Sequence, residues 1–350
     1  MQNRKIIMVQ RPVGEPTDEC FQLVEEAVPD LDAGQILVKV LWLSLDPYMR
    51  GRMNDVKSYA TPVQIGEVMV GESAGVVLAS RSERYAVGDY VTVHKGWQTH
   101  IVVNDDDARL MKVDLRNGSL SAHLGVVGMP GRTAYFGLME VGKPVAGETL
   151  VVAAASGAVG SVVGQLAGIL GLTVIGIAGG EEKCRYVREE LGFDDCLDHK
   201  LPDLAGRLRE ACPKGIDIYF ENVGGQVTRA VAPLLNPGAR VPICGYVSRY
   251  NDEDITKAET PFDILKGLDP VPEHRFFVVT EWQDQWAKAT EQLGTWLREG
   301  KLEYRESIGE GIENAPALFR GLLKGRNFGK QLVRVADESR LIRDAIDSAS

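Results

Sequence analysis

A glycine-rich turn between two apolar segments is the feature of this sequence with the clearest chemistry. The turn reads Ala154-x-x-Gly157-x-x-Gly160, with alanine in place of the first glycine of the commoner Gly-x-Gly-x-x-Gly pattern. Small residues let a pyrophosphate approach the first turn of a helix, where unpaired amide groups and the helix dipole attract negative charge. The pattern predicts a dinucleotide phosphate site at residues 157–160.

The segments on either side of this turn show which secondary-structure elements it connects. Residues 149–180 contain no charged side chain, and about 20 apolar residues suffice to span a membrane. Repeated glycines, and a residue pattern that changes along the run from strand-like to helical and back, argue against a membrane helix. We predict a buried strand at 150–154, a helix at 159–170 ending at Gly171, and a second strand at 172–178, which together form a βαβ unit. The alternative is a glycine-tolerant helix that packs on a sheet and binds nothing.

The end of the second strand bears on the choice of dinucleotide. NAD enzymes usually carry an acidic residue there, which binds the ribose hydroxyls, whereas NADP enzymes supply a cation. Gly179 takes the acidic position, and Lys183 lies within reach of a 2′-phosphate, so the pattern favours NADP. In the competing interpretation, Glu181 binds the ribose and Lys183 is a solvated surface charge.

Composition limits the partners and the compartment. The 350 residues carry a formal charge of −10, which argues against a general nucleic-acid binder or a binder of anionic membranes. The five cysteines are scattered and form no Cys-x-x-Cys pair, and the N-terminal apolar run is too short for a secretory signal. We therefore expect a reduced, cytoplasmic protein with no nucleic acid and no membrane as a partner.

The remaining chain divides into a β-rich part and an α/β part. Before residue 128 we predict short strands at 36–43, 68–70, 75–78, 90–94 and 100–103, typical of a barrel-like domain. After the βαβ unit we predict helices at 182–191, 204–211 and 282–298, and strands at 216–220, 240–244 and 276–279. Residues 252–273 read as a mobile loop, strands at 301–308 and 330–335 return to the first domain, and a charged tail follows Asp337.

Six motifs in this order make the chain similar to the medium-chain dehydrogenase/reductase superfamily. Within it, the chain resembles the zinc-independent group of leukotriene hydroxydehydrogenase/prostaglandin reductases, plant 2-alkenal reductases and bacterial curcumin-type reductases. The resemblance covers nearly the whole chain. The motifs are LDPYMR (45–50), MPGRTAYFGL (129–138), AASGAVGSVVG (154–164), NVGG (222–225), CGYVSRYN (244–251) and NFGK (327–330).

The resemblance implies an α/β fold class, with a GroES-like β-barrel domain and a Rossmann domain built on a doubly wound parallel sheet. The implied boundaries are 1–128 for the first part of the GroES-like catalytic domain, 129–299 for the NADP-binding domain and 300–350 for the return to the catalytic domain. The family is usually a homodimer whose Rossmann sheets join edge to edge, and residues 276–279 are our candidate for that edge.

The resemblance also implies the cofactor NADPH and its contacts. The pyrophosphate would bind at Gly157, Ala158, Val159 and Gly160, and the 2′-phosphate at Lys183. His199 stands where the reductases often carry a tyrosine; it is retained as a cofactor contact, against the alternative of a surface histidine. The other implied contacts are Asn222, Cys244, Gly245, Tyr246, Val247, Ser248, Arg249, Tyr250, Phe277, Val278, Val279 and Asn327.

No metal site is expected. Zinc alcohol dehydrogenases of the superfamily carry Gly-His-Glu where this chain reads Val70-Gly71-Glu72, so glycine replaces the metal-binding histidine. The cysteine ligand expected near residues 44–46 is also absent. Without a Lewis acid the chain is poorly equipped to polarise an alcohol. Reduction of a carbon–carbon double bond conjugated to a carbonyl needs only a hydride at the β-carbon and hydrogen-bond donors for the resulting enolate.

We therefore expect an NADPH-dependent reductase of α,β-unsaturated aldehydes and ketones. Tyr250 would donate to the enolate oxygen, and Tyr48 would orient this small-molecule substrate or help to deliver a proton. Without the resemblance, either tyrosine reads as an ordinary half-buried aromatic. The alternatives are an NADPH quinone oxidoreductase, an allylic alcohol dehydrogenase and a non-catalytic nucleotide-binding protein, which an activity test separates.

Overall fold

The computed structural model describes residues 1–56 and 60–337, and the chain forms two compact units. The first unit contains residues 1–124, 306–327 and the described residues from 331 onward; the second contains 125–305 and 328–330. The divisions fall at 124/125 and 305/306, where the sequence suggested 128/129 and 299/300. The charged tail predicted after Asp337 lies outside the described residues.

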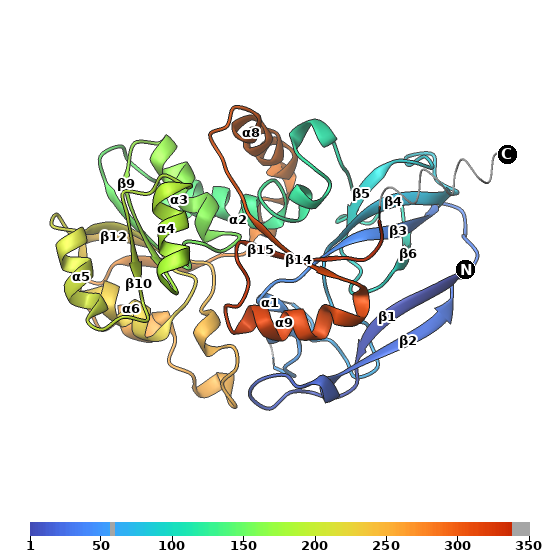
Figure 1. The fold of residues 1–350 in the computed structure, drawn as a ribbon, viewed down its shortest axis with the longest axis horizontal. Helices are drawn as coiled ribbons and strands as arrows, with labels where there is room; N and C mark the ends of the chain where they lie inside the picture. Colours follow the sequence, from blue (N-terminus) through green and yellow to red (C-terminus); the bar gives the residue numbers. More distant parts are fainter. Residues whose placement is uncertain (57–59, 338–350) are drawn as a thin grey trace. The chain divides into compact units, whose positions relative to one another are not determined.

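A parallel sheet of six strands is the centre of the second unit (Figure 1). Every neighbouring pair in it is parallel, in the order β10-β9-β8-β11-β12-β13. All five residues of the central strand β8 are buried, as expected for a strand covered on both faces. The predicted doubly wound sheet is confirmed. The strands are β8 (Thr149–Ala153), β9 (Thr173–Ala178), β10 (Asp195–Asp198), β11 (Ile216–Phe220), β12 (Leu235–Ile243) and β13 (Glu273–Phe276).

Helices cover this sheet. The strand order reverses direction between β8 and β11, so right-handed crossovers place the two sets of helices on opposite faces. Leu208, Val231 and Leu265 share one core cluster with Val151 and Ile177 of the sheet, whereas α3 and α4 pack on β9 and β10 (Figure 1). The helices are α2 (Met129–Phe136), α3 (Gly160–Ile169), α4 (Glu181–Glu189), α5 (Leu204–Ala211), α6 (Gly225–Val231), α7 (Pro261–Leu265) and α8 (Trp286–Arg298).

The first unit is built on an antiparallel sheet that curls around β3. This long strand pairs with β4 along one edge and with β6 and then β15 along the other. Its core includes Ile36, Val38 and Val40, which alternate along β3 and are fully buried. The β-rich first domain is thus confirmed. The strands are β3 (Gln35–Ser44), β4 (Ser73–Ser80), β5 (Tyr90–Val93), β6 (His100–Asn104), β7 (Met111–Lys112), β14 (Glu306–Glu310) and β15 (Lys330–Arg334).

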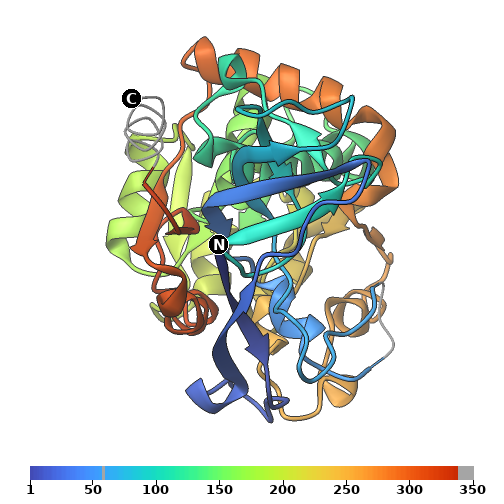
Figure 2. The same cartoon turned by 90° about the vertical axis from the view of Figure 1, so that its right-hand side faces the viewer.

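A separate hairpin and two short helices complete this unit. The hairpin joins β1 (Gln2–Met8) to β2 (Phe21–Ala27) and appears in dark blue in Figure 2. The helices are α1 (Tyr48–Arg52) and α9 (Ala315–Leu323). In the part of the chain that the structure describes, no helix combines the length and apolar character needed to cross a membrane.

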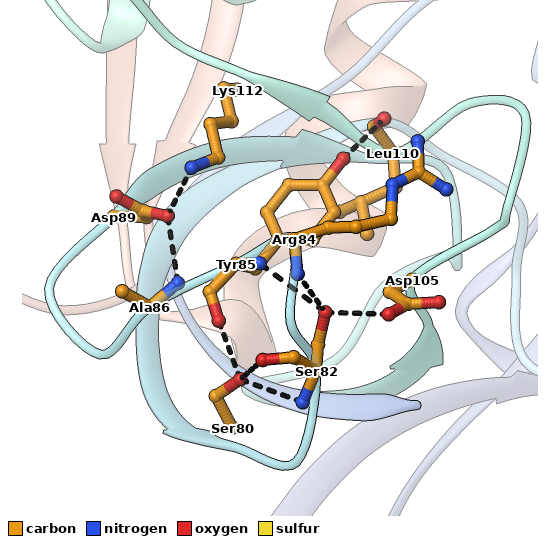
Figure 3. A network of polar contacts seen from close by, with 9 residues as sticks. All are labelled: Ser80, Ser82, Arg84, Tyr85, Ala86, Asp89, Asp105, Leu110 and Lys112. Carbon is orange, nitrogen blue, oxygen red and sulfur yellow. Dashed lines mark hydrogen bonds and ion pairs between the residues drawn. The ribbon is translucent and has the colours of Figure 1, made fainter. Parts of the chain in front are cut away.

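The loop between β4 and β5 is held by a network of polar contacts (Figure 3). The Ser82 hydroxyl donates to Asp105 Oδ2 at 2.5 Å and accepts from the amides of Arg84 at 2.9 Å and Tyr85 at 3.2 Å. The Tyr85 hydroxyl donates to the carbonyl of Leu110 at 3.1 Å. These bonds satisfy backbone groups of a loop that has no strand partner, so the network has a structural role.

Several local predictions were wrong. The edge strand is Glu273–Phe276, not 276–279, and the predicted loop 252–273 contains α7, which starts at a capping box on Thr260. Residues 68–70 form only an isolated bridge at Val68, and β12 spans Leu235–Ile243, whereas the strand was predicted at 240–244. The α-helix predicted from 282 begins at Trp286, after a 3₁₀ segment interrupted by a non-helical Trp282.

Candidate functional site

The carboxyl ends of the six parallel strands gather most of the predicted cofactor residues. Residues 157–160 follow β8, Lys183 follows β9, His199 follows β10 and Asn222 follows β11. Residues 244–250 follow β12, and 277–279 follow β13. Ligands of open parallel sheets bind at this edge, where the strand order reverses.

The glycine turn after β8 has the close contacts that its sequence predicts. Ala154 adopts a left-handed conformation, with φ of 53°, which turns the chain sharply at the end of the strand. A Cβ at Gly160 would lie 2.3 Å from the Ala154 carbonyl oxygen, and a Cβ at Gly157 would lie 3.1 Å from it. Any larger residue at 160 would push α3 away from the strand, so the turn keeps a bare backbone where a phosphate would approach.

Asp198 ties together the two loops that follow β9 and β10. Its Oδ1 accepts from the amides of Gly180 and Lys200, each at 2.9 Å. Burial alone would raise the pKa of Asp198, but these hydrogen bonds and the nearby His199 and Lys200 lower it overall. The ionised carboxylate therefore fixes the loop that carries His199 beside the loop that leads to α4 and Lys183.

The competing ribose ligand Glu181 has a different partner. Its Oε1 accepts from the Arg188 guanidinium at 2.7 Å, on the exposed face of α4. Lys183 is half-buried on the same helix, and burial lowers its pKa, with a further lowering by Lys200. Glu181 is thus paired with Arg188, whereas Lys183 lies within electrostatic range of Lys200 in the loop after β10, which is consistent with the NADP interpretation of this turn.

Glu221 joins the loops after β11 and β12, and sequence reasoning missed it. Its buried carboxylate accepts from the amides of Val223 at 2.8 Å and Gly224 at 2.9 Å, and from the Thr228 hydroxyl. Its backbone carbonyl accepts from the amides of Cys244 at 2.9 Å and Gly245 at 3.3 Å. Burial raises the pKa of Glu221, against the effect of these donors.

Backbone hydrogen bonds continue this connection along the two loops. The Val247 amide donates to Asn222 at 3.1 Å, and the Ser248 amide donates to Val223 at 3.0 Å. The Asn222 side chain donates to the Ala153 carbonyl at 2.8 Å, which links this pair of loops to the end of β8. Burial raises the pKa of the neighbouring Cys244 to about 12, so its thiol is neutral near pH 7.

Tyr250 lies over the backbone of Gly245. A Cβ at Gly245 would come within 2.6 Å of the Tyr250 hydroxyl, so a side chain there would displace the phenol. The ring of Tyr250 also meets that of Tyr246 edge to face, with centroids 5.7 Å apart. The hydroxyl of Tyr250 is thereby held at the carboxyl end of β12, among the predicted cofactor residues.

The residues after β13 have partners within their own unit. Phe277 is buried, and its ring packs against Phe220 and Trp282 at centroid distances of 6.0 and 6.1 Å. The Val278 amide donates to Glu281, and the Val279 carbonyl accepts from the Trp286 indole. The Phe277 ring is thus occupied by packing contacts, and the cofactor contacts expected of residues 277–279 stay a prediction.

Tyr48 and Asn327 belong to the first unit. Asn327 lines a groove between β14 and α9, together with Ile308 and Leu318. Tyr48 begins α1, and its hydroxyl lies 2.9 Å from His94 Nε2. Burial, followed by the charge of Arg109, lowers the pKa of His94 to about 4, so this partner of Tyr48 is a neutral imidazole near pH 7. Sequence reasoning missed His94, since it lies 46 residues away along the chain.

The residues at the zinc position of related dehydrogenases do not fit a metal. A Cβ at Gly71 would lie 3.0 Å from the Trp97 indole and 3.2 Å from Met49, so a histidine there would require these neighbours to shift. The Ser44 hydroxyl donates to Asp46 in the region where a cysteine ligand would be expected. Across residues 1–56 and 60–337, no group of three His, Cys, Asp or Glu side chains is placed to hold a metal ion.

The chain matches known protein families and sequences over most of its length. Residues 4–113 match the family described as the N-terminal domain of oxidoreductase, and residues 158–270 match the zinc-binding dehydrogenase family. The chain is 47% identical to an NADPH-dependent curcumin reductase of Escherichia coli over 339 residues, which cover 96% of this chain and 98% of that protein. It is 39% identical to prostaglandin reductase 1 of Bos taurus over 327 residues, covering 92% and 96% of the two chains.

A solved structure is equally similar. CurA of Vibrio vulnificus in complex with NADPH superposes with a TM-score of 0.89 at 46% sequence identity, over 95% of this chain and 99% of that one. The match includes both units, so it extends well beyond the glycine turn and its βαβ unit.

Proposed function

The chain belongs to the medium-chain dehydrogenase/reductase superfamily, in the group of the curcumin and prostaglandin reductases, and from this premise we propose that it is an NADPH-dependent ene reductase. Its substrates are α,β-unsaturated aldehydes and ketones, and it saturates their carbon–carbon double bond. The observation that carries the proposal is the 47% identity with an NADPH-dependent curcumin reductase over 96% of the chain. Curcumin itself carries carbon–carbon double bonds conjugated to carbonyl groups.

The residues at the sheet edge fit the cofactor. Residues 157–160 offer the bare backbone that a pyrophosphate needs, and Lys183 offers a cation on the first turn of α4. The paired loops 222–225 and 244–250 would border the nicotinamide and its ribose. When bound, NADPH supplies the hydride that adds to the β-carbon of the substrate.

We assign Tyr250 as the hydrogen-bond donor for the substrate's carbonyl oxygen. Addition of hydride to the β-carbon moves negative charge onto that oxygen, and a donor already fixed in place stabilises this charge without reorganisation. The support for Tyr250 is its position, with the hydroxyl held over Gly245 at the end of β12 and the ring packed on Tyr246. Water is the source of the proton for the α-carbon in this scheme.

We assign Tyr48 an orienting role that depends on His94. The hydrogen bond between the Tyr48 hydroxyl and His94 Nε2 fixes the direction of the phenol. Because the buried imidazole is neutral near pH 7, His94 is a poor acid and would not supply a proton through Tyr48. Orientation of the substrate therefore suits this pair better than proton delivery.

The proposal extends to metal use, assembly and compartment. We propose zinc-independent catalysis, since Gly71 stands at the position of a histidine ligand and a larger residue there would crowd Trp97 and Met49. We propose a cytoplasmic homodimer in which two parallel sheets join at β13, the edge strand, where Phe276 is 36% exposed. All five cysteines are free thiols, which suits a reducing compartment.

The experiment that tests the activity is NADPH consumption with enones, enals and one quinone, with products identified by mass spectrometry. The expected product is the saturated ketone or aldehyde with its carbonyl intact. An allylic alcohol as the product would contradict the proposal and indicate carbonyl reduction. Consumption of NADPH with the quinone alone would favour the quinone oxidoreductase alternative.

A further inference from the structure

We infer that His199 and Lys200 join Lys183 in one 2′-phosphate site, and that binding of the phosphate is coupled to protonation of His199. The inference rests on the proposed NADPH dependence and adds a ligand, Lys200, and a proton to it. It predicts that the preference for NADP over NAD depends on pH.

Two of the three basic side chains border Gly179, and the third lies on the helix that follows it. A Cβ built on Gly179 would lie 2.9 Å from His199 Nε2 and 3.3 Å from Lys200 Cε. An acidic side chain at this position, as in NAD enzymes, would therefore collide with the imidazole. Lys183 lies on the first turns of α4, directly after the same strand end. Gly179 thus leaves the space that His199 and Lys200 border.

The backbone beneath these side chains is fixed. Ala178 and Asp198 are register partners in β9 and β10, and the His199 amide donates to the Ala178 carbonyl at 3.0 Å. Asp198 Oδ1 holds the amides of Gly180 and Lys200 together. The loops that carry the three cations are therefore preorganised, which lowers the entropic cost of binding an anion between them.

The charges of the cluster repel one another. Partial burial lowers the pKa of His199, and Lys200 and Lys183 lower it further, against the opposing charge of Asp198 and a main-chain hydrogen bond. Lys200 likewise lowers the pKa of Lys183, which Glu182 opposes. Asp198 is 8% exposed and its carboxylate already binds two amides. A phosphate dianion would relieve this repulsion among the cations.

The dependence of NADP binding on pH follows from the directions in which these charges shift the pKa of His199. Without ligand, His199 is mainly neutral near pH 7, because its pKa lies below the ordinary value of 6.5. A dianion beside the imidazole raises that pKa, so between the two pKa values the protein takes up a proton as it binds NADP. Affinity for NADP then falls as pH rises through the pKa of the complex, by up to about tenfold per pH unit, whereas affinity for NAD does not change.

Calorimetric titration of the wild type with NADP⁺ at pH 7.5, in two buffers of different ionisation enthalpy, measures the proton uptake directly. The free 2′-phosphate has a pKa of about 6 and is already a dianion at this pH, so it contributes no uptake. We expect a fraction of one proton for NADP⁺ and none for NAD⁺. His199→Gln should abolish the uptake, and His199→Tyr should abolish it while retaining a hydroxyl donor for the phosphate.

Lys200→Gln should weaken NADP⁺ binding about tenfold and leave NAD⁺ binding unchanged. The matched controls are His274→Gln and the exposed Lys214→Gln in the same unit, which should bind NADP⁺ like the wild type. Uptake that persists in both His199 variants, or Lys200→Gln binding NADP⁺ at full strength, would overturn the inference. Enone reduction by such a protein would still support the proposed function, because the titration uses no substrate.

Discussion

At the scale of single residues, the role of Tyr250 depends on the glycine beneath it. The phenol occupies space that any side chain at 245 would fill, since a Cβ there lies 2.6 Å from the hydroxyl oxygen. Tyr246 then supports the ring from the side. In the proposed mechanism, this residue pair holds the donor for the developing enolate, with no metal or charged group required.

Replacement of Tyr250 by phenylalanine tests this role. Loss of one preorganised donor to an oxyanion costs about 10²–10³ in turnover. We expect Tyr250→Phe to lower kcat by this amount while NADP⁺ affinity stays near that of the wild type, as measured by steady-state kinetics and fluorescence titration. Tyr246→Phe, which keeps the ring contact, is the matched control. Full turnover in Tyr250→Phe would refute the assignment.

His94 has a consequence for stability in acid. Burial lowers its pKa from 6.5 to about 4 in the folded protein, so between these values the unfolded chain binds a proton that the native chain does not. Stability contributed by neutral His94 is thus present above pH 6.5, is lost as pH falls toward 4, and changes no further below 4. The loss between pH 7 and pH 5 is about 2 kcal/mol.

Urea unfolding at pH 7 and pH 5 measures this contribution. The wild type should lose about 2 kcal/mol more than His94→Gln over this interval, because glutamine does not titrate. His274→Gln serves as the comparison, since His274 lies in the other unit. Equal losses in the wild type and His94→Gln would show that His94 does not titrate in this range.

At the scale of elements, the loops after β11 and β12 behave as one structure. Glu221 binds the amides of Val223 and Gly224 through its carboxylate and those of Cys244 and Gly245 through its carbonyl. Few of these groups could find other partners, because Glu221 is fully buried. The Glu221 side chain thereby holds the loop after β11, and its main-chain carbonyl holds the start of the segment that ends at Tyr250.

Glu221→Ala should release the loop after β11, because it removes the carboxylate that binds Val223, Gly224 and Thr228 but keeps the main-chain carbonyl that binds Cys244 and Gly245. The loss of a buried hydrogen-bonded carboxylate leaves several donors unsatisfied, at a cost of about 3 kcal/mol. We expect weaker NADP⁺ binding together with this loss in the free energy of unfolding, measured by titration and by urea denaturation. Ser82→Ala in the network of Figure 3 should cost about 1 kcal/mol and leave NADP⁺ binding unchanged. Unaltered NADP⁺ affinity in Glu221→Ala would contradict the role given to it.

Sequence reasoning succeeded where the signal is local. The helix at Leu204–Ala211 and the strand at Ile216–Phe220 were predicted to the residue, because apolar periodicity and nearby breakers define both. The glycine turn was recognisable for the same reason. The hairpin β1–β2 was missed, since β2 is mostly exposed and carries little apolar alternation.

Residues that act through contacts distant in sequence were not predictable. Asp198 and Lys200 matter only because β10 pairs with β9 in a register that places Asp198 beside Ala178. The contact of His94 with Tyr48 likewise exists only because the end of β5 lies near α1 in the folded chain. The displaced edge strand shows the same limit: with the strand at Glu273–Phe276, Phe277 lies in the core instead of in an exposed edge.

At the scale of the whole molecule, the proposed homodimer would form at an edge of the parallel sheet. β13 ends the strand order, and an edge strand offers backbone donors and acceptors to a second copy of the chain. Two copies related by a two-fold axis would place the same residues of β13 next to each other. The proposed homodimer uses this edge.

Phe276→Lys tests that arrangement. Phe276 is 36% exposed in the single chain, so a lysine is tolerated there, whereas two lysines would be brought together in the dimer. We expect the wild type to be a dimer and Phe276→Lys to be largely monomeric by light scattering after gel filtration. Val271→Lys, at an exposed site before the strand, should remain dimeric. A dimeric Phe276→Lys would exclude β13 as the interface.

The central claim is the transfer of hydride from NADPH to the β-carbon of an enone. The most direct measurement uses NADPH labelled with deuterium at the transferred position of C4, a simple enone, and NMR of the product. The account predicts deuterium at the β-carbon, a solvent-derived proton at the α-carbon and an intact carbonyl. Deuterium on the carbonyl carbon of an allylic alcohol would contradict it.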